Sequence, residues 1–302
     1  MELRQIRYFL KVAELLNFSE ASKSLFITQS TLSQQIRQLE QEFDTVLFDR
    51  NSHEVSLTEA GQQLYRCARQ LISDADTCVQ KMTDLKNMLA GELNIGVTFT
   101  FSPLLTETVL EFMKQYPNVR LNIYYKTMSE LMDMLQQRDI DFVLAFKPTD
   151  MNDKIDSHVL FGNRLSVVAS ENHPLAKRKS LTIDDIMLYD MALPARGLQA
   201  RNIFDEMILK MNGKIKVRIE LNDVSILLKL IRQSKLITVL AEATIHDEEG
   251  LVAIPLEIAD FSMEGCIHIR KQSYVKNSAR EFYRLLSQSR AVLKYSSLAN
   301  LL

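Results

Sequence analysis

Apolar positions recur with a helical period through most of the first ninety residues. The first stripe predicts an amphipathic helix over residues 3–16, and Ser19 is the expected N-cap of a short second helix that ends near Leu25. A third helix follows and continues to about Phe43. Residues 47–57 lack a helical period and predict a small two-stranded wing, after which Thr58 caps a long helix. The N-terminal region is therefore predicted to be nearly all helical.

The third predicted helix carries a dense row of neutral hydrogen-bonding side chains. On a helical wheel Leu32, Ile36 and Leu39 share one face, which can pack on the first two helices. The opposite face suits the donors and acceptors of base edges in the DNA major groove, and an N-cap at Thr28 leaves helix amides free for a phosphate. Such a face is also often merely solvated, so the pattern alone leaves both interpretations open. The candidate DNA-binding residues of this helix are Thr28, Gln29, Ser30, Thr31, Ser33, Gln34 and Arg37.

The long helix after Thr58 has the cleanest periodicity in the chain. Its apolar residues are spaced alternately by four and three, a period of 3.5 residues that is typical of a coiled coil. Roughly 29 residues at ~1.5 Å each give a helix about 44 Å long. An exposed seam of that length requires a partner helix, so we predict a dimer or tetramer; packing on the chain's own globular domain is the alternative. The predicted dimerisation seam consists of Leu64, Ala68, Leu71, Ala75, Cys78, Met82, Leu85 and Leu89.

The pattern changes at Gly91, where short β-rich runs begin to alternate with helical segments. This alternation predicts doubly wound, mostly parallel sheets, and about two hundred residues with this many strands suit two small α/β lobes. The expected strands lie at residues 92–99, 119–125, 140–146, 164–170, 189–193, 216–221, 235–240 and 265–270. The expected helices lie at residues 103–116, 129–137, 198–211, 223–233 and 278–293.

Composition and charge narrow the function classes. The 302 residues are 46% hydrophobic and 25% charged, which is typical of a soluble protein with more than one domain. No apolar run approaches the ~18 residues of a membrane span, and the N-terminus lacks the pattern of a secretory signal, so we expect a cytoplasmic protein. Residues 1–60 hold six Lys/Arg against nine Asp/Glu. DNA binding would therefore depend on where the charges point.

The chemistry-bearing residues argue against an enzyme. The sequence has no GxGxxG, Walker-type phosphate loop, GxSxG or HExxH, and its five histidines lack the spacing of metal ligands, so we expect no metal and no cofactor. The odd number of cysteines without CxxC predicts reduced thiols. Cys67 and Cys78 lie about 16 Å apart on one predicted helix, too far to bridge, and Cys266 is alone in the C-terminal half. Disulfide sensing within one chain is not expected.

The stretch NFSEASKSLFITQSTLSQQIRQLEQEFDTVLFDR, followed by VSLTEAG, resembles the signature of the LysR-type transcriptional regulators of bacteria. The resemblance continues through the long helix, the two-lobed half and HPLA at residues 173–176. It implies a winged helix-turn-helix domain at residues 1–58, a linker and dimerisation helix at 59–90, and an effector-binding regulatory domain at 91–302. Within that domain, lobe I would comprise about 91–162 and 267–302, and lobe II about 163–266. The matching residues are Phe18, Ala21, Leu25, Gln29, Ser33, Ile36, Leu39, Glu40, Leu47, Phe48, Arg50, Leu57, Thr58, Ala60 and Gly61.

The resemblance implies roles for residues at matching positions. Gln29, Ser30 and Ser33 would face bases in the major groove. Arg37 and the wing residue Arg50 would contact phosphate or the minor groove, contacts that position a protein on DNA and weaken with salt. For Ser33 the alternative is a solvated hydroxyl group.

Two positions depart from the family pattern. Asp44 stands where the family commonly has glycine, at the end of the third helix, where a left-handed conformation is expected. His53 stands where the wing often carries a second arginine, and it is our remaining candidate DNA contact. For Arg50 the alternative is an ion pair with Asp49 or Glu54. With the acidic N-terminal balance, these features predict weak nonspecific DNA binding.

The resemblance also implies two lobes like those of periplasmic binding proteins, with a small molecule between them. Ligands of α/β folds bind at the carboxyl ends of strands, near helix N-termini. Hydroxyl groups and free amides there suit a carboxylate or similar anion, which an arginine could pair with. The alternative is that Ser and Thr before a helix are plain N-caps. The candidate effector-binding residues are Thr98, Thr100, Ser102, Thr127, Met128, Arg196 and Gln199.

The sequence thus predicts a LysR-type DNA-binding transcriptional regulator, an activator or a repressor, and not an enzyme. Its fold would combine an all-α winged helix-turn-helix domain, a long linker helix and a two-lobed α/β regulatory domain. A dimer or tetramer would place its heads on double-stranded promoter DNA, and a small, anionic effector would change their spacing. RNA polymerase is a further candidate partner, and a membrane is not. The alternatives are DNA binding without a ligand, and an α/β ligand-binding protein that does not bind DNA.

Overall fold

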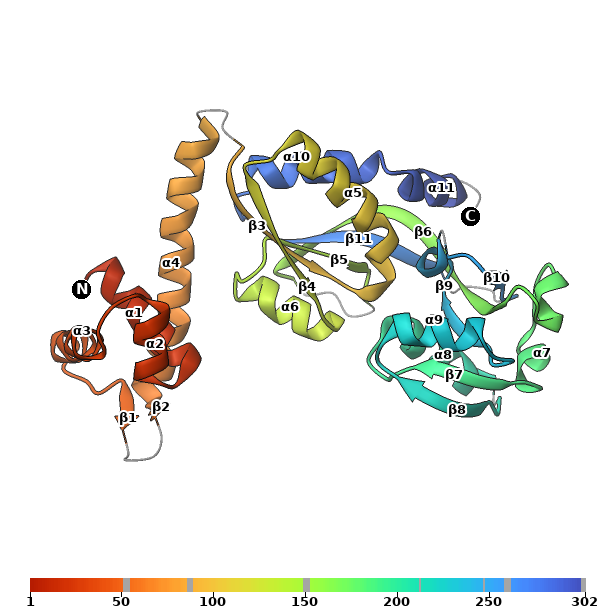
Figure 1. Cartoon of the computed structure of the whole chain (residues 1–302), viewed down its shortest axis with the longest axis horizontal. Helices are drawn as coiled ribbons and strands as arrows, with labels where there is room; N and C mark the ends of the chain where they lie inside the picture. Colours follow the sequence, from red (N-terminus) through yellow and green to blue (C-terminus); the bar gives the residue numbers. More distant parts are fainter. Residues whose placement is uncertain are drawn as a thin grey trace. The chain divides into compact units, whose positions relative to one another are not determined.

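The computed structural model describes residues 1–50, 55–85, 89–148, 153–211, 213–246, 248–257 and 262–299. The chain divides into two compact units, Met1–Asn87 and Met88–Leu302, which Figure 1 draws together. The division falls close to residue 91, where the regulatory domain was predicted to begin.

The first unit contains three short helices, a two-stranded wing and one long helix, as predicted. The helices enclose a small apolar core to which Ile6, Phe9, Leu32, Ile36 and Leu39 contribute fully buried side chains. The wing strands pair antiparallel, and the tip between them lies outside the described residues. The elements are α1 (Leu3–Leu15), α2 (Phe18–Ser24), α3 (Gln29–Glu42), β1 (Phe48–Arg50), β2 (Val55–Leu57) and α4 (Glu59–Leu85).

The N-cap of α2 is Asn17, so the prediction of Ser19 was wrong. The Asn17 side-chain oxygen accepts hydrogen bonds from the backbone N–H groups of Ser19 (2.9 Å) and Glu20 (3.0 Å). One amide oxygen therefore satisfies two of the helix's orphan donors, and the helix begins two residues earlier than expected. The predicted N-caps Thr28 and Thr58 are confirmed, because each hydroxyl accepts the backbone N–H three residues along the chain.

α4 begins in close contact with the base of the wing. A Cβ atom at Gly61 would lie 2.1 Å from the Leu47 carbonyl oxygen, so only glycine permits this approach. One turn further, Leu64 and Ala68 pack into the core of the first unit. For these two residues of the predicted seam, the alternative of packing on the chain's own domain is therefore what the structure shows.

The middle of the predicted seam is more exposed to solvent than its start. Leu71 and Met82 are 38% and 57% exposed, Cys78 is also exposed, and Ala75 between them is half-buried. An apolar stripe over these turns of α4 thus faces solvent.

The C-terminal end of the seam needs a correction at Leu89. α4 ends at Leu85, whose side chain lies outside the described residues, as do residues 86–88. Leu89 is not helical and packs against the core of the second unit. The regular spacing of apolar residues therefore continued past the end of α4.

The second unit contains a seven-stranded sheet and a separate two-stranded sheet, with helices on their faces (Figure 1). The strand order is β10-β6-β11-β5-β3-β4, with β9 also paired to β6, and the second sheet is β7-β8. The elements are β3 (Gly91–Val97), η1 (Phe99–Phe101), α5 (Ser102–Gln115), β4 (Val119–Tyr125), α6 (Met128–Gln136), β5 (Phe142–Phe146), β6 (Ile155–Ser170), η2 (Pro174–Lys177), α7 (Ile183–Met187), β7 (Asp190–Pro194), α8 (Gln199–Lys210), β8 (Lys216–Leu221), α9 (Val224–Arg232), β9 (Thr238–Ala241), η3 (Glu242–Ile245), β10 (Leu251–Pro255), β11 (Ser262–Arg270), α10 (Asn277–Ser287) and α11 (Arg290–Ala299).

The prediction of mostly parallel sheets was wrong. β3 pairs parallel with β4 and β5, and β7 with β8, but every pairing of β6 or β11 is antiparallel. Figure 1 shows β6 running from the part that holds β3, β4 and β5 toward the part that holds β7 and β8. Strand direction depends on which strands meet in space, and the alternation of strands and helices does not reveal this for two long crossing strands.

Several further elements differ from prediction. α7 was not predicted because its five residues are too few to show a helical period, and β10 was not predicted because its run ends in Pro255. β6 begins at Ile155, nine residues before the expected strand at 164–170. The last predicted helix is two helices, α10 and α11, which are separated at Ser289. The Ser289 hydroxyl accepts the backbone N–H of Val292 (3.3 Å) and so begins the new helix.

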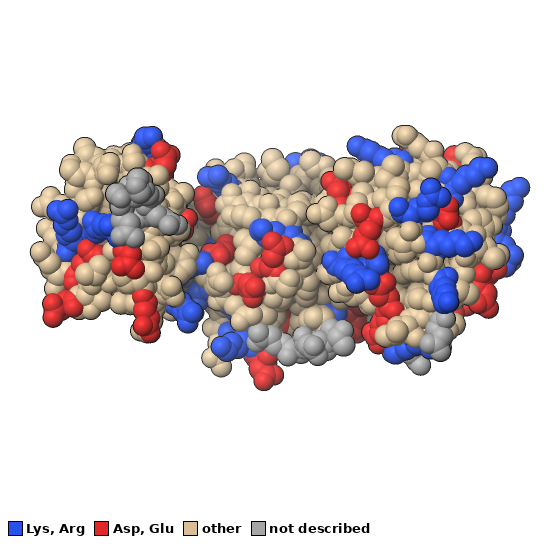
Figure 2. All heavy atoms as spheres, turned by 90° about the horizontal axis from the view of Figure 1, so that it is seen from below, with Lys and Arg blue, Asp and Glu red and all other residues tan. Residues whose placement is uncertain are grey.

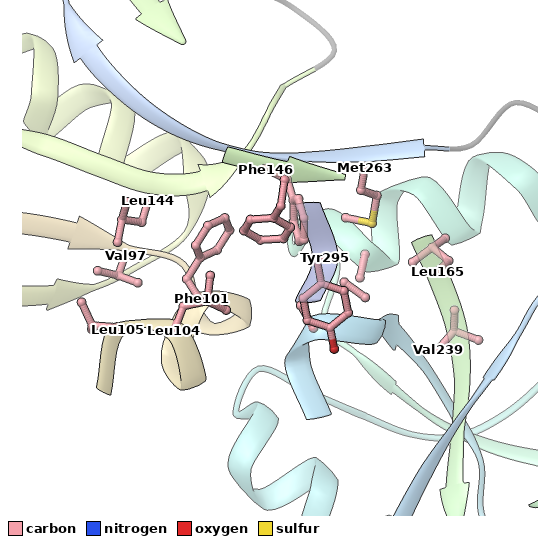
Figure 3. Packing of buried hydrophobic residues seen from close by; sticks show 14 of the residues in the cluster. Val97, Phe101, Leu104, Leu105, Leu144, Phe146, Leu165, Val239, Met263 and Tyr295 are labelled. Carbon is pink, nitrogen blue, oxygen red and sulfur yellow. The ribbon is translucent and has the colours of Figure 1, made fainter. Parts of the chain in front are cut away.

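One apolar core extends through both parts of the second unit. The rings of Phe101, Phe146 and Phe161 contact one another, with centroids 5.4, 5.6 and 6.3 Å apart, and Figure 3 shows the cluster continuing past Tyr295 to Val239. At Gly265 a Cβ atom would lie 2.4 Å from the Phe161 ring, so glycine is required where β11 passes this cluster. The two parts of the unit are therefore joined by packed side chains as well as by strands.

Candidate nucleic-acid interface and effector site

α3 is held so that one face is buried and the other is open. Leu32, Ile36 and Leu39 are fully buried in the first unit's core. Thr28 caps the helix, with its hydroxyl oxygen 3.1 Å from the Thr31 backbone nitrogen. Because the buried stripe fixes the helix about its axis, the opposite side chains are fixed in direction as well.

The polar side chains of the α3 region fall into two groups. The first belongs to the N-cap: the Thr28 hydroxyl lies 2.9 Å from that of Ser30 and 2.8 Å from that of Thr31. The second group makes no side-chain hydrogen bond or ion pair with the described part of the chain, so its donors and acceptors are available to a ligand. Its members are Gln29, Ser33, Gln34 and Arg37.

The cations of the first unit are mostly neutralised within the chain. Of the six Lys/Arg in residues 1–50, Arg37 is the one without a carboxylate partner among the described residues. Figure 2 shows basic and acidic side chains interspersed on the face that it draws. The other five form the pairs Arg4–Glu2 (3.2 Å), Arg7–Asp76 (2.6 Å), Lys11–Glu14 (2.6 Å), Lys23–Glu20 (2.8 Å) and Arg50–Glu40 (3.0 Å).

Arg50 joins the wing to α3. Its guanidinium pairs with Glu40, the partner that the sequence did not indicate, and lies 4.6 Å from the centre of the Phe18 ring. The other carboxylate oxygen of Glu40 accepts the backbone N–H groups of Leu47 (3.0 Å) and Phe48 (3.4 Å). Arg50 thus has a structural role, and its contact with DNA stays a prediction. His53 lies outside the described residues, as does Glu54.

The predicted effector residues near β3 and β4 mostly make local bonds. The Thr98 hydroxyl donates to the Leu144 carbonyl (3.4 Å), and that of Ser102 to the Phe99 carbonyl (2.7 Å). Thr127 caps α6 and donates to the Glu130 carboxylate (2.6 Å).

The pKa of Glu130 shows the effect of the hydrogen bonds at this cap. The hydroxyl and backbone N–H of Thr127 lower the pKa of Glu130 to about 2. The expected alternative, a plain cap, therefore describes Thr127 well. Thr100 makes no side-chain hydrogen bond to the described residues, and Met128 is half-buried beside the core under α6.

The predicted effector residues of lobe II lie at the start of α8. Arg196 is exposed, and Gln199 donates from its side-chain nitrogen to the Lys147 carbonyl (2.7 Å), which ties α8 to the end of β5. The Gln199 side-chain oxygen is buried and has no partner among the described residues. α8 also lacks a side-chain N-cap, so its first backbone amides remain available. No hydrogen bond in the described part joins Arg196 to the threonines of lobe I.

Comparisons with known proteins decide the family. Residues 3–62 match the family model described as bacterial regulatory helix-turn-helix protein, lysR family, and residues 86–291 match the LysR substrate binding domain. The chain belongs to the LysR family. It is a DNA-binding transcriptional regulator with an effector-binding domain, and not an enzyme, as predicted.

Curated relatives of this LysR-family chain match it along nearly its whole length. The HTH-type transcriptional regulator BsdA of Bacillus subtilis is 26% identical over 290 residues, which cover 94% of this chain and 100% of the relative. The transcriptional dual regulator GltC of the same species is 28% identical over 292 residues, 95% of this chain and 97% of the relative.

Solved structures support the fold. A full-length OxyR variant from Pseudomonas aeruginosa has a TM-score of 0.71 at 19% identity, covering 98% of this chain and 96% of that chain. CbnR in complex with its target DNA has a TM-score of 0.67 at 17% identity, covering 95% and 99%. At these identities the likeness shows the shared fold.

Asp44, which departs from the LysR pattern, adopts the expected left-handed conformation with φ of +48°. Its backbone N–H donates to the Gln41 carbonyl (3.2 Å), and that of Thr45 donates to the Glu40 carbonyl (3.0 Å). These two bonds close the end of α3 in the way that glycine usually allows.

Sequence reasoning missed two features near the candidate sites of this regulator. Phe26, in the turn before α3, is 95% exposed. Phe99 and Tyr125, which follow β3 and end β4, have ring centroids 5.4 Å apart beside the predicted effector residues. The sequence signal for Phe26 was an aromatic residue in a turn, and for the ring pair it was an aromatic residue at the end of each of two expected strands.

The described residues contain no group of three or more His, Cys, Asp or Glu side chains arranged to hold a metal ion. Among the described helices, none combines the length and apolar character needed to cross a membrane.

Proposed function

We propose that the outer face of α3 reads the major groove of promoter DNA, with Gln29, Ser33, Gln34 and Arg37 as the reading residues. One observation carries the proposal: Arg37 is the uncompensated cation of residues 1–50, and it shares a helix face with three uncommitted polar side chains. Gln and Ser offer donors and acceptors to base edges, and Arg pairs with guanine or phosphate.

Arg50 and His53 are secondary contacts in this proposal. Arg50 keeps its ion pair with Glu40 and uses its remaining N–H groups toward phosphate, because breaking a half-buried pair would leave Glu40 uncompensated. Ser30 and Thr31 lie on the same exposed side of α3, but their hydroxyls are shared with the Thr28 cap.

We also propose that two chains pair through the exposed stripe of α4 at Leu71, Ala75, Cys78 and Met82. These side chains repeat with a coiled-coil spacing, and a solvent-facing apolar stripe of this kind is buried by a second copy. A dimer or tetramer then binds a partly palindromic site. In this proposal the regulator acts in the cytoplasm, and RNA polymerase is its further partner.

The proposed effector is a small carboxylate or similar anion bound near the start of α8. Arg196 is exposed there, the first amides of α8 are uncapped, and the Gln199 oxygen lacks a partner. Thr100 is the lobe I hydroxyl that is left for the same ligand, because Thr98, Ser102 and Thr127 make local bonds.

Titration of labelled DNA from the region upstream of this gene tests the DNA-binding proposal. We expect binding at least about a thousandfold tighter than to a shuffled sequence of equal composition. Equal affinity for both DNAs would reject the assignment of reading residues.

A thermal-shift screen with small organic acids tests the effector proposal. We expect an acid that raises the melting temperature of the wild-type protein and has no effect on Arg196→Ala. Arg218→Ala is the matched control, because Arg218 is also exposed on the same unit but pairs with Asp190 (3.0 Å). If no acid shifts the wild-type protein, DNA binding without a ligand becomes the better description.

A further inference from the structure

Phe26 is the most exposed large apolar side chain in the described part of the chain, at 95%. It lies in the turn between α2 and α3. Its backbone adopts a left-handed conformation with φ of +56°, which is rare for a residue with a bulky side chain. Neither core packing nor backbone preference explains a phenylalanine here.

The turn itself would favour glycine at this position. α2 ends with the Phe26 N–H donating to the Lys23 carbonyl (3.1 Å) and the Ile27 N–H donating to the Ser22 carbonyl (3.1 Å). This is the Schellman pattern, in which the residue at the place of Phe26 is usually glycine, because a side chain is disfavoured in the left-handed region. The chain therefore accepts both backbone strain and an exposed aromatic ring.

The position of the ring points to a ligand. Phe26 comes two residues before Thr28, the N-cap of α3, and the two hydrogen bonds of the turn hold it near the N-terminus of that helix. The outer side chains of α3 are the ones proposed to read DNA. We propose that the Phe26 ring contacts the apolar edge of duplex DNA, either a thymine methyl group or the C–H face of a deoxyribose, and so adds to operator specificity. This inference rests on the proposed DNA-reading role of α3.

The surroundings favour DNA over a protein partner. The exposed neighbours Ser24, Thr28 and Gln29 are polar, and Lys23 is paired with Glu20 (2.8 Å). A docked protein needs a contiguous apolar patch, whereas a single ring among hydroxyl and amide groups suits a groove wall where methyl groups lie among polar atoms.

Two variants separate the ring from the stability of the fold. Phe26→Ala removes the ring, and Phe26→Gly removes it while relieving the left-handed strain, so we expect Phe26→Gly to melt no lower than wild type. Both variants should bind the upstream DNA about tenfold more weakly, since a proposed dimer loses two apolar contacts. Leu16→Ala is the matched control: Leu16 is 47% exposed with φ of +47°, but it is the C-cap of α1, in the turn before α2 and not in the turn before α3. It should bind DNA as wild type does.

Replacing single thymines of the bound DNA by deoxyuridine distinguishes the two apolar groups. If Phe26 contacts a methyl group, one replacement per half-site weakens wild type and has no effect on Phe26→Gly. If it contacts a deoxyribose, no replacement matters, but both variants still bind more weakly. Each result supports the inference.

Unchanged DNA affinity in both variants would overturn the proposed contact between Phe26 and DNA. It would do so even if transcription from the promoter fell, because the ring would then bind a protein partner. Failure of wild type to prefer its upstream DNA is a separate result, which rejects the proposed role of α3 as a whole.

Discussion

Similar polar side chains are free of hydrogen bonds to the described residues on α3 but are hydrogen-bonded near the ends of β3 and β4. On α3, Gln29, Ser33 and Arg37 make no side-chain bonds within the described chain. In the second unit, Ser102 and Thr127 are occupied by neighbouring groups at 2.7 and 2.6 Å. Both sets were candidate ligand contacts on the sequence, yet only the first remains fully available.

The hydroxyl groups of the second unit are occupied because they lie at helix N-termini, Ser102 at the start of α5 and Thr127 as the N-cap of α6. Within the first turn, a hydroxyl group can reach unpaired backbone and side-chain partners, as Thr127 does at α6. On α3 the place of the cap is taken by Thr28, so the Gln29 amide is not used there, and Ser33 and Arg37 lie beyond the first turn. Thr28 supports this view, because it lies beside the available residues of α3 but acts as a cap.

The largest expected effect is that of Arg37→Ala on DNA binding. Each copy should lose about 2 kcal/mol, so a proposed dimer loses about 4 kcal/mol, roughly a thousandfold in affinity. Fluorescence anisotropy on the upstream DNA measures this. Arg4→Ala, which removes an exposed arginine already paired with Glu2, should change affinity little. Equal losses in both variants would mean that the availability of Arg37 is unimportant.

The buried His268 should make the stability of the second unit depend on pH. Its side-chain nitrogens lie 2.7 Å from the Ser157 hydroxyl and 3.2 Å from the Ala145 carbonyl oxygen, and burial lowers its pKa from 6.5 to about 4. Between these values the unfolded chain takes up a proton and the folded chain does not, so stability falls as pH falls from 6.5 toward 4.

By pH 4 this single group should remove about 3 kcal/mol of the stability present at pH 7. Denaturant unfolding of wild type and His268→Gln across pH 7 to 4.5 measures the difference. The variant should be less stable at pH 7 but less sensitive to acid. Parallel curves for the two proteins would show that His268 is not the titrating group.

Salt should weaken DNA binding only modestly. If Arg37 is the main phosphate-facing cation, a dimer releases about two counterions, and affinity should fall about tenfold between 50 and 200 mM salt. A fall of a thousandfold would show that Arg50 or other paired cations leave their carboxylates on binding. The comparison between available and occupied side chains would then describe only the free protein.

The smallest expected effect is that of Thr127→Ala. Losing the α6 cap should cost about 1 kcal/mol of unfolding free energy and leave DNA affinity unchanged. Thr100→Ala is the control, because that hydroxyl makes no bond in the described chain and its loss should cost under about 0.5 kcal/mol. If the two variants melt alike, Thr127 is not primarily a cap.

Local sequence signals determined much of this molecule. The period of apolar residues predicted α1, α3 and α4, and the hydroxyl residues Thr28 and Thr58 correctly marked the starts of α3 and α4. Caps and amphipathic stripes depend on residues only a few positions apart. The family signature then added the DNA-binding role. The five residues of α7 were too few to show a helical period.

The tertiary structure decided what distant residues do to one another. His268 meets Ser157 across paired strands, and β6 meets β11 antiparallel, although each segment alone fits either direction. The same holds for charge: the sequence shows six cations in residues 1–50, but only folding brings Arg50 to Glu40 and leaves Arg37 unpaired. Pairing over long separations depends on packing of the whole chain, and it is this packing that leaves one cation available on α3.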